Sequence, residues 1–375
     1  MESRTWLDID LDALSANYAQ VCALTKARVT CVLKSNAYGH GSVAIARHLC
    51  TLGCDSFAVS CAAEAYELRT NDIASEILIM GLVSAQEADV LLALPHAERL
   101  IFTVSETDDL LLLEQAAMRS GVQVRAHLKV DTGFHRLGFE STPEAAERIA
   151  GTVLSCTHLC VTGLYSHLGL VTQARDEAQY RKLLAMRDYL RAFGVRGLEM
   201  HLCDSIGLVR YPQWHFDRVR VGAFLYGARP SRTENMPLTC RETIAFRTRV
   251  AQVHTAKAGD VVGYGEIPLT EDTVIATLCA GYGDGYPRAL SEGVGEVVLG
   301  GKRCKVLGLV CMDQMMVDAS ACPNVRKGDI ATLLGDGITY AEYADWAWST
   351  RNECLARLSQ RPTRIYHSRD TQDEA

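Results

Sequence analysis

The sequence predicts an α/β protein, with an N-terminal (β/α)8 barrel of the TIM type and a C-terminal mostly-β domain. Eight short runs rich in β-branched residues recur within the first 225 residues, and segments with helical spacing separate them. No glycine fingerprint follows the first run, which disfavours the competing architecture, a doubly wound open sheet. After residue 228 the chain changes to closely spaced strand-like runs.

Each predicted barrel strand is a short apolar run. In chain order they are VTCVL (29–33), SFAVS (56–60), EILIMG (76–81), RLIFTV (99–104), VQVRAHLKV (122–130), CVTGLYSH (160–167), LEMHLC (198–203) and FDRVRV (216–221). Between them, segments such as SVAIARHLCTLG, SAQEADVLLALP, ETDDLLLLEQAAMRSG and RDEAQYRKLLAMRDYLRAFG place apolar residues three and four positions apart. That spacing gathers apolar side chains on one helix face, so these segments are expected to cover the barrel.

A polar, proline-containing stretch, ARPSRTENMPLT, begins at residue 228 and is predicted to link two domains. Beyond it, RTRVAQVHTA, TVIATLCAGYGDGY, GEVVLGGKRCKVLGLVCMDQMMVDA and DIATLLG predict a small β barrel or sandwich. We expect residues 1–12 to form a strand that joins the β domain, residues 13–230 to form the barrel, and residues 231–375 to form the β domain.

The composition is that of an ordinary globular protein. The 375 residues are 48% hydrophobic and 22% charged, with a net charge of −7 and no basic run, which disfavours nucleic acid as a partner. The 14 cysteines form no metal-binding spacing, so no metal site is expected, and most are predicted to be buried free thiols. No apolar stretch is long enough for a signal peptide or a membrane span. We expect a cytoplasmic protein that would be tethered to a membrane only through an additional domain.

Chemically active side chains follow several of the predicted strands. A lone lysine that ends a strand, as Lys34 does after VTCVL, often only extends its amine into water. Here the strand ends carry, in chain order, Lys34, Lys129 with Asp131 and Arg136, His167, Ser205, and Arg220 followed by Gly222. Because catalytic groups in barrels of this type lie at the C-terminal strand ends, we expect these side chains to surround one site.

The last two strands predict an anion site. Ser205 ends the seventh predicted strand, and Gly222 and Ala223 open a predicted helical turn after the eighth, where free backbone amides would face a phosphate. A lysine facing a phosphate site suggests pyridoxal 5'-phosphate, because lysine forms a Schiff base with its aldehyde.

Seven motifs, in order along nearly the whole chain, resemble those of the alanine racemase family. They are VLKSNAYGHG, HLKVDTGFHRLG, HLCDS, VRVGAFLYG, GYGEI, GYGDGYPR and VCMDQMMVD. The resemblance implies a pyridoxal-phosphate enzyme with an N-terminal barrel and a C-terminal β domain, which agrees with the predicted fold. It also implies a homodimer whose active sites are shared between subunits.

The resemblance assigns the two catalytic bases. Lys34 would hold the cofactor and serve as the base on the D face of the substrate, and Tyr264 would reach the partner subunit's cofactor and serve the L face. Two bases on opposite faces are what racemisation needs, since one removes the Cα proton and the other returns one from behind. An exposed loop tyrosine that only packs its ring is the structural alternative for Tyr264.

Further roles come from the same resemblance. Arg220 would donate to the pyridine nitrogen and keep it unprotonated, because a guanidinium does not release its proton. The remaining assignments are His167 stacked on the cofactor ring, Arg136 at the cofactor's phenolic oxygen and the substrate carboxylate, Tyr38, Ser205, Gly222 and Ala223 at the phosphate, Met312 and Asp313 beside the partner's substrate, and Tyr282 in the entrance corridor. Lys129 matches a lysine that is carbamylated in many members, and an ion pair with Asp131 is the alternative. Each of the others has a packing alternative.

Two positions depart from the family pattern. Asn352, in TRNECLARLSQRPTRIY, stands where the family has a tyrosine at the substrate side chain, as in serine racemases associated with vancomycin resistance. An amide there could bond a hydroxymethyl group, so serine is expected as a substrate besides alanine. Asp204, in HLCDS, replaces the usual asparagine and has no predicted role.

Two rival functions remain open on the sequence. A non-enzymatic protein that binds pyridoxal phosphate would resemble the barrel alone and would lack the β domain with Tyr264. A decarboxylase of the same two-domain plan would be expected to place an acidic residue where Arg220 stands. The pathway, whether cell-wall D-alanine supply or antibiotic resistance, also stays open.

Overall fold

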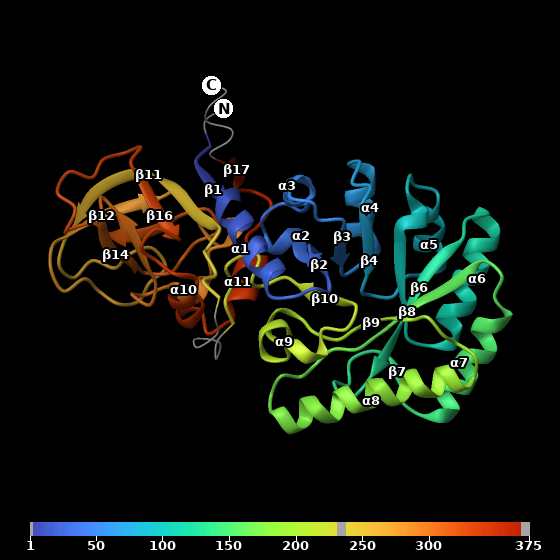
Figure 1. The fold of residues 1–375 in the computed structure, drawn as a ribbon. Coiled ribbons are helices and arrows are strands. Elements are labelled where there is room, and N and C mark those ends of the chain that lie inside the picture. Colours follow the sequence, from blue (N-terminus) through green and yellow to red (C-terminus); the bar gives the residue numbers. More distant parts are fainter. Residues whose placement is uncertain (1–2, 231–237, 369–375) are drawn as a thin grey trace.

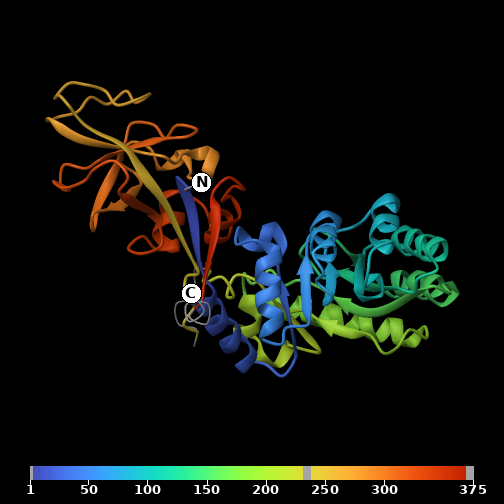
Figure 2. The same ribbon diagram turned by 90° about the horizontal axis from the view of Figure 1, so that it is seen from above.

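The computed structural model describes residues 3–230 and 238–368, and its strands form two sheets (Figure 1). The barrel occupies one half of the molecule and the strand-rich domain the other, as the view from above also shows (Figure 2). Residues 231–237 of the predicted linker lie outside the described residues.

The first sheet is a closed barrel of eight parallel strands. They are β2 (Arg28–Val32), β3 (Ser56–Val59), β4 (Glu76–Ile79), β5 (Leu100–Val104), β6 (Val124–Asp131), β8 (Leu159–Tyr165), β9 (Glu199–His201) and β10 (Arg218–Val221). Neighbours in this order pair with one another, and β10 pairs with β2 to close the ring. The short β7 (Phe139–Glu140) adds to the edge of β6. The predicted barrel is therefore confirmed, and the doubly wound sheet is excluded.

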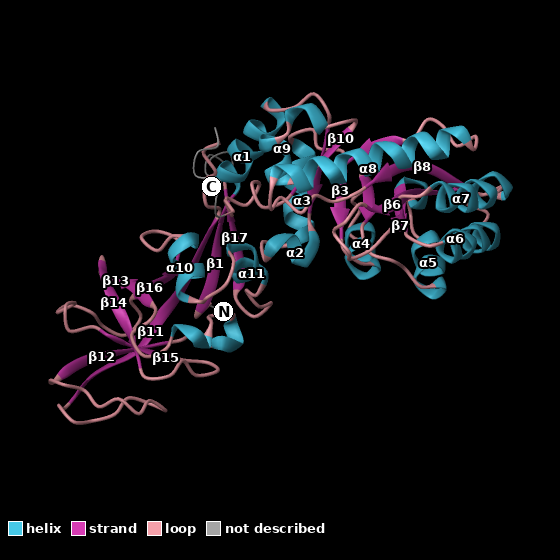
Figure 3. Cartoon of the chain, turned by 90° about the horizontal axis from the view of Figure 1, so that it is seen from below, coloured by secondary structure: helices cyan, strands magenta, loops and turns pink. Residues whose placement is uncertain are grey.

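Helices surround the barrel (Figure 3). They are α1 (Leu11–Ala23), α2 (Lys34–Tyr38), α3 (Ser42–Thr51), α4 (Ala62–Thr70), α5 (Ala85–Leu92), α6 (Thr107–Ser120), α7 (Pro143–Ser155), α8 (Gln173–Ala192) and α9 (Ser205–Arg210). Their starts follow local rules: Thr142 accepts a hydrogen bond from the Ala145 amide with Pro143 at the first helical position, and Ser84 forms a capping box with Glu87. The outer helix layer makes the strands buried on both faces, so they read as continuous apolar runs.

The second sheet contains a smaller antiparallel barrel. Its strands are β11 (Ile244–Ala256), β12 (Thr273–Leu278), β13 (Glu296–Leu299), β14 (Lys302–Leu307), β15 (Met315–Asp318) and β16 (Ile330–Leu334), and β11 closes the ring on β12. Gly300 and Gly301 connect β13 to β14, and both have positive φ (57° and 76°), as a two-residue hairpin turn requires. The predicted C-terminal β domain is confirmed.

The chain ends of the described residues join this second sheet. β1 (Thr5–Asp10) lies between β11 and β17 (Thr363–His367), antiparallel to the first and parallel to the second. Asp10, the last residue of β1, caps α1 by accepting from the Ala13 amide at 2.7 Å, so the chain enters the barrel directly. Helices α10 (Tyr340–Trp346) and α11 (Arg351–Ala356) precede β17, and α11 lies against α2 of the barrel.

Two local predictions were wrong. The residues after β10 form hydrogen-bonded turns, with the Leu225 amide bonded to the Gly222 carbonyl, instead of a helical turn. The cysteines are all free thiols, but only six of the 14 are buried, because several lie on the outer faces of elements that sequence spacing alone does not orient. None of the helices in the described residues has both the length and the apolar character needed to cross a membrane.

Candidate active site

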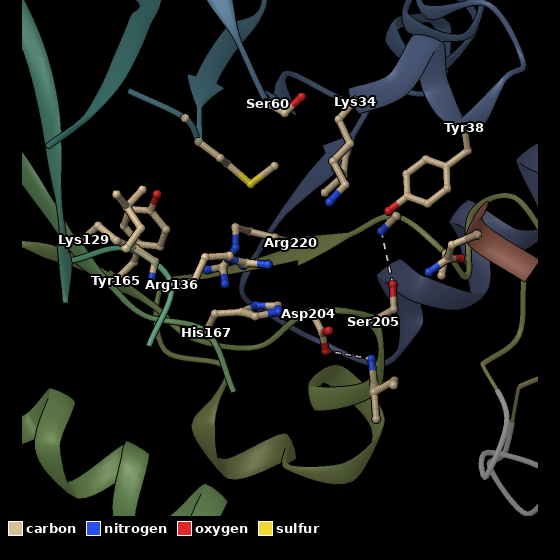
Figure 4. A pocket seen from close by; sticks show the side chains of 18 of the residues that line it. Lys34, Tyr38, Ser60, Lys129, Arg136, Tyr165, His167, Asp204, Ser205 and Arg220 are labelled. Carbon is tan, nitrogen blue, oxygen red and sulfur yellow. Dashed lines mark hydrogen bonds between the residues drawn. The ribbon is translucent and has the colours of Figure 1, made fainter. Parts of the chain in front are cut away.

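A cavity of about 640 Å³ opens at the C-terminal ends of the barrel strands (Figure 4). Ten of the predicted site residues line it: Lys34, Tyr38, Lys129, Arg136, His167, Ser205, Arg220, Gly222, Ala223 and Asn352. They come from segments up to 318 positions apart, since 352 − 34 = 318, and Asn352 reaches the cavity from α11, outside the barrel. The structure thus brings together most of the residues that the sequence predicted to be neighbours.

The lysine begins a left-handed turn. α2 has φ between 51° and 54° at Ser35 to Tyr38, a conformation that costs a non-glycine residue about 1–2 kcal/mol. Local hydrogen bonds hold it: the Ser35 amide donates to Glu64 Oε1 at 2.6 Å, and Asn36 Oδ1 accepts from the Ser42 amide at 2.9 Å. Figure 4 shows Lys34, just before this turn, and Tyr38, its last residue, both directed into the cavity. The strained turn therefore orients the Lys34 and Tyr38 side chains into the same cavity.

The opposite wall is built around Arg220. Its Nη2 donates to the carbonyls of Ser166 and Leu202 at 2.8 and 3.1 Å, and its Nη1 lies 2.5 Å from His201 Nδ1. These contacts fix the guanidinium in a buried position from behind. Three of its five N–H groups are used in this way, which leaves two for other partners.

A third group of residues forms a polar pocket for an anion. The Gly222 amide donates to Ser205 Oγ at 3.1 Å, and a Cβ atom at Gly222 would lie 2.6 Å from Tyr38 Oη. Glycine is therefore needed here, because its backbone and the Tyr38 hydroxyl approach the same small space. The Ser205 and Tyr38 hydroxyls, which meet beside the Gly222 backbone, are donors suited to a phosphate group.

Ser205 does not end the seventh strand, as the sequence suggested. β9 ends at His201, and Ser205 is the first residue of α9. Asp204, which had no predicted role, is the N-cap of this helix, and its Oδ1 accepts from the Ile206 and Gly207 amides at 3.0 and 2.9 Å. An aspartate immediately before a short apolar segment is a capping signal that could have been recognised in the sequence.

The cavity is strongly cationic. Four of the side chains that line it are lysine or arginine, and Asp204 is the one acidic side chain among the described residues that do so. Burial lowers the pKa of Lys34, and the nearby Arg136 lowers it further. Burial also lowers the pKa of His167 well below its usual value, and the charges of Arg220 and Arg136 lower it further. The site therefore presents positive charge, a neutral imidazole and an amine whose pKa is lower than that of an exposed lysine.

Lys129 is not paired with Asp131 in the described structure. Asp131 Oδ1 accepts hydrogen bonds from the amides of residues 133–135 at 2.9–3.0 Å, while Lys129 Nζ donates to the Val130 carbonyl at 3.3 Å. Burial, then Arg220 and Arg136, lower the pKa of Lys129 to about 7. The ion-pair alternative for Lys129 is therefore not the arrangement observed, and much of this amine is neutral near pH 7.

The other predicted site residues lie elsewhere on the chain. Tyr264, Tyr282, Met312 and Asp313 line a second cavity of about 620 Å³ in the β domain. Tyr264 is 75% exposed and Met312 is 55% exposed, and Arg361 holds the segment by bonding Asp313 Oδ1 at 2.6 Å and the Met312 carbonyl at 3.3 Å. A single chain therefore does not bring Tyr264 and Lys34 into one cavity.

Sequence reasoning missed Tyr165 in the cavity wall and His201 behind that wall. Tyr165 lines the cavity, stacks on His201 at 4.5 Å with an interplanar angle of 10°, and has the Lys129 amine 5.2 Å from its ring centre. His201 supports Arg220 from behind. Tyr165 and His201 both lie near the ends of predicted barrel strands, which could have marked them as site residues. Aromatic and histidine side chains at such positions are, however, equally compatible with the protein core.

These residues fit pyridoxal 5'-phosphate. The Tyr38 and Ser205 hydroxyls meet at the Gly222 backbone, where a Cβ would collide with Tyr38, and both can donate to a phosphate. Lys34 supplies a partly buried amine with a lowered pKa, and Arg220 supplies a fixed donor. A dianionic cofactor would also offset the excess positive charge of the cavity.

Comparisons with known proteins agree with these features. The family model for the alanine racemase N-terminal domain matches residues 9–230, and that for the C-terminal domain matches residues 243–366. The chain is 34% identical to alanine racemases of Symbiobacterium thermophilum and Carboxydothermus hydrogenoformans, over 96% of this chain and 97% and 99% of theirs. The solved structure of alanine racemase from Clostridium difficile 630 superposes with a TM-score of 0.92 at 27% identity, covering 98% of this chain and 97% of that one.

Proposed function

The chain belongs to the alanine racemase family and is an amino-acid racemase, and we propose that it interconverts L- and D-alanine with pyridoxal 5'-phosphate bound in the barrel cavity. The observation that carries the cofactor assignment is the cationic cavity in which the Lys34 amine lies with the cradle of Tyr38, Ser205 and Gly222.

The cofactor, when bound, withdraws electrons from the amino acid and so acidifies its Cα proton. Lys34 would supply the amine that holds the cofactor, while the Ser205 and Tyr38 hydroxyls would bind the phosphate beside Gly222 and Ala223. Arg220 would donate a hydrogen bond to the pyridine nitrogen and, because a guanidinium keeps its proton, would leave that nitrogen unprotonated. An unprotonated pyridine nitrogen would weaken the electron withdrawal from the substrate, and this favours return of a proton to Cα over side reactions.

Two bases act on opposite faces of the substrate. Lys34, with its lowered pKa, is able to take the Cα proton on one face. We assign the second base to Tyr264 of the partner subunit in a homodimer. Its separate location and its 75% exposed side chain support this assignment, since an exposed tyrosine on the β domain is free to enter another chain's cavity. Arg136 would bind the substrate carboxylate, and Met312, Asp313 and Tyr282 of the partner would line the approach.

The direct test measures D-alanine and D-serine formed from the L-amino acids by the purified protein supplied with pyridoxal phosphate. Formation of D-alanine is expected. Release of carbon dioxide instead would favour the decarboxylase alternative, and neither product would favour a cofactor-binding protein. Arg220 stands where a decarboxylase would be expected to have an acidic residue, and it is held by His201 and by the Ser166 and Leu202 carbonyls, which argues against the decarboxylase.

Serine is proposed as a second substrate. Asn352 lines the cavity and adjoins a smaller chamber of about 180 Å³ that shares Pro230 and Asn352 with it. The amide offers both a donor and an acceptor to a hydroxymethyl group, and it occupies less volume than an aromatic ring.

Replacing Asn352 by tyrosine is expected to lower the serine-to-alanine ratio of kcat/KM by roughly 10-fold or more, because the serine hydroxyl would lose its partner. The measurement compares D-serine and D-alanine formation by the variant and the parent protein. Asn71→Tyr, at the C-terminal end of α4 and outside the cavity lining, serves as the control. An unchanged ratio would remove Asn352 from the specificity argument.

We also propose that Lys129 is carbamylated. Its neutral amine attacks carbon dioxide, which forms the N–C bond of a carbamate and releases one proton. The pKa of about 7 supports this step, and the resulting anion would lie among Arg136 and Arg220, whose charges both act on Lys129. Carbon-13-labelled bicarbonate is expected to give one slowly exchanging carbamate signal that is absent from Lys129→Ala. Lack of that signal in the parent protein would contradict the proposal.

The location of the protein is a further proposal. All 14 cysteines are free thiols, which supports a reducing compartment such as the cytoplasm.

A further inference from the structure

Two buried histidines connect Arg220 to a cluster of ion pairs deeper in the barrel. Arg220 Nη1 lies 2.5 Å from His201 Nδ1, and His201 Nε2 lies 2.9 Å from His127 Nδ1. His127 Nε2 lies in turn 3.8 Å from Glu199 Oε2. Both histidine side chains are fully buried, so these contacts are not replaced by bulk water.

Elementary hydrogen-bond chemistry fixes the proton positions along this chain of contacts. A guanidinium is a donor only, so His201 Nδ1 must accept from Arg220 and cannot carry a proton. The proton of neutral His201 then lies on Nε2, from which it donates to His127 Nδ1. His127 Nδ1 is therefore also an acceptor, and the proton of His127 lies on Nε2.

The charged forms of the two rings would disrupt this order. Burial and the charge of Arg218 lower the pKa of His127 to about 3, while burial and Arg220 lower the pKa of His201 well below its usual value. Both rings are thus neutral across the physiological range. With both rings neutral and Arg220 fixed as a donor, one tautomer of each histidine satisfies the contacts.

The Nε2 proton of His127 is the last one in this series of contacts, and its surroundings are defined. His127 Nε2 has no hydrogen-bond partner in the described structure, and Glu199 Oε2 lies 3.8 Å from it. Glu199 is itself held by Arg218, whose Nε and Nη2 donate to its two oxygens at 2.7 Å. Arg218 also pairs with Glu76 at 2.7 Å. The N–H of His127 therefore faces a negative group that is fixed in place.

The packing around the rings prevents a flip. A Cβ atom at Gly163 would lie 2.5 Å from Cδ2 and Nε2 of His127, so the imidazole rests directly on the glycine backbone. Tyr165 stacks on the other ring, His201, and its hydroxyl bonds Thr103 at 2.7 Å. A ring flip of either histidine would reverse its donor and acceptor atoms against neighbours that have little room to move.

We propose that His127 and His201 act as a tautomer lock, in which His127 is a positioning residue that holds His201 as a hydrogen-bond acceptor for Arg220. The proposal rests on the proposed function only in the assumption that Arg220 faces the cofactor ring. Without an acceptor at position 127, His201 could move its proton to Nδ1, where it would oppose the Arg220 N–H and displace the guanidinium. The two histidines therefore connect the fixed Glu199–Arg218 ion pair to Arg220, and so hold the guanidinium in place at the cavity.

The first test examines the parent protein and needs no turnover. Nitrogen-15-labelled histidine is introduced, and two-dimensional proton–nitrogen spectra report which ring nitrogen of each histidine carries the proton, with and without pyridoxal phosphate. His127 and His201 are both expected as the neutral Nε2–H tautomer from pH 6 to 9. A proton on Nδ1 of His201, or a charged ring, would overturn the proposal even if the protein racemises alanine.

The second test separates positioning from packing. His127→Leu removes the acceptor, whereas His127→Asn places an amide oxygen near the former Nδ1. His127→Leu is expected to shift the absorbance spectrum of the bound cofactor and to lower kcat by roughly 10-fold, the lower end of the range for groups that orient a ligand from behind. His127→Asn is expected to restore both properties to within about threefold of the parent.

His215→Leu is the matched control. His215 is also buried and hydrogen-bonded, to the Leu208 carbonyl at 2.7 Å and Thr25 Oγ1 at 2.8 Å, but it does not line the cavity. It is expected to lower thermal stability without moving the cofactor spectrum. If His127→Leu behaves like this control, or if His127→Asn fails to restore the spectrum while it folds normally, the role of His127 is structural and the lock is refuted.

Discussion

Lys34→Ala is expected to abolish stable cofactor attachment and to lower turnover by at least about 1,000-fold. The amine of Lys34 is assigned both the attachment of pyridoxal phosphate and proton removal from one face, and loss of a positioned base alone costs roughly 10²–10⁴-fold. The measurements are the absorbance of bound cofactor after dialysis, borohydride reduction followed by peptide mapping, and the rate of D-alanine formation. Lys26→Ala, which removes an exposed lysine, should leave all three unchanged.

The pH dependence of attachment gives a further check on Lys34. Only the neutral amine attacks an aldehyde, so the rate at which the apoprotein binds the cofactor should rise with pH. Because burial and Arg136 lower the pKa of Lys34 from the ordinary 10.5, this rate should level off below pH 10.5. A reduced cofactor found on another lysine, or a rate that still rises above that pH, would contradict the assignment.

Tyr264→Phe is expected to keep the cofactor bound while turnover falls by about 10²–10⁴-fold, since a ring without its hydroxyl cannot transfer a proton. The hydroxyl is not needed for folding, because the side chain is 75% exposed in the single chain. Tyr66→Phe, at an exposed position on α4, is the control. A variant that loses the cofactor together with activity would point to a structural role for Tyr264.

Mixing the two inactive variants tests whether the site is shared. In a mixed dimer of Lys34→Ala and Tyr264→Phe, one site would combine both defects and the other would contain an intact Lys34 and an intact Tyr264. Refolding equal amounts together should restore roughly a quarter of the parent activity, because half of the dimers are mixed and each has one intact site. No restoration, despite proven subunit exchange, would place both bases in one chain and contradict the proposed arrangement.

The sequence by itself determined the architecture of this protein. Strands such as SFAVS and EILIMG are recognisable because a parallel barrel covered by helices buries both faces of each strand, and this leaves a continuous apolar run in the sequence. Helix starts such as Thr142 before Pro143 are equally local. The cavity residues at strand ends followed from the same logic, because the C-terminal ends of parallel strands meet at one face, whereas Tyr38 and Asn352 were identified only through the family resemblance.

Only the tertiary structure decided how these residues act. The left-handed turn at Ser35 to Tyr38 depends on signs of φ that non-glycine residues rarely adopt, and it is held by Glu64 from a different helix. The contact between His127 and His201 joins side chains 74 positions apart, which no local pattern encodes. The separation of Tyr264 from Lys34 is also a tertiary fact, because their motifs are both clear in the sequence but lie in different domains. Local patterns set the elements, whereas long-range packing set the dihedral angles, protonation states and distances that the chemistry requires.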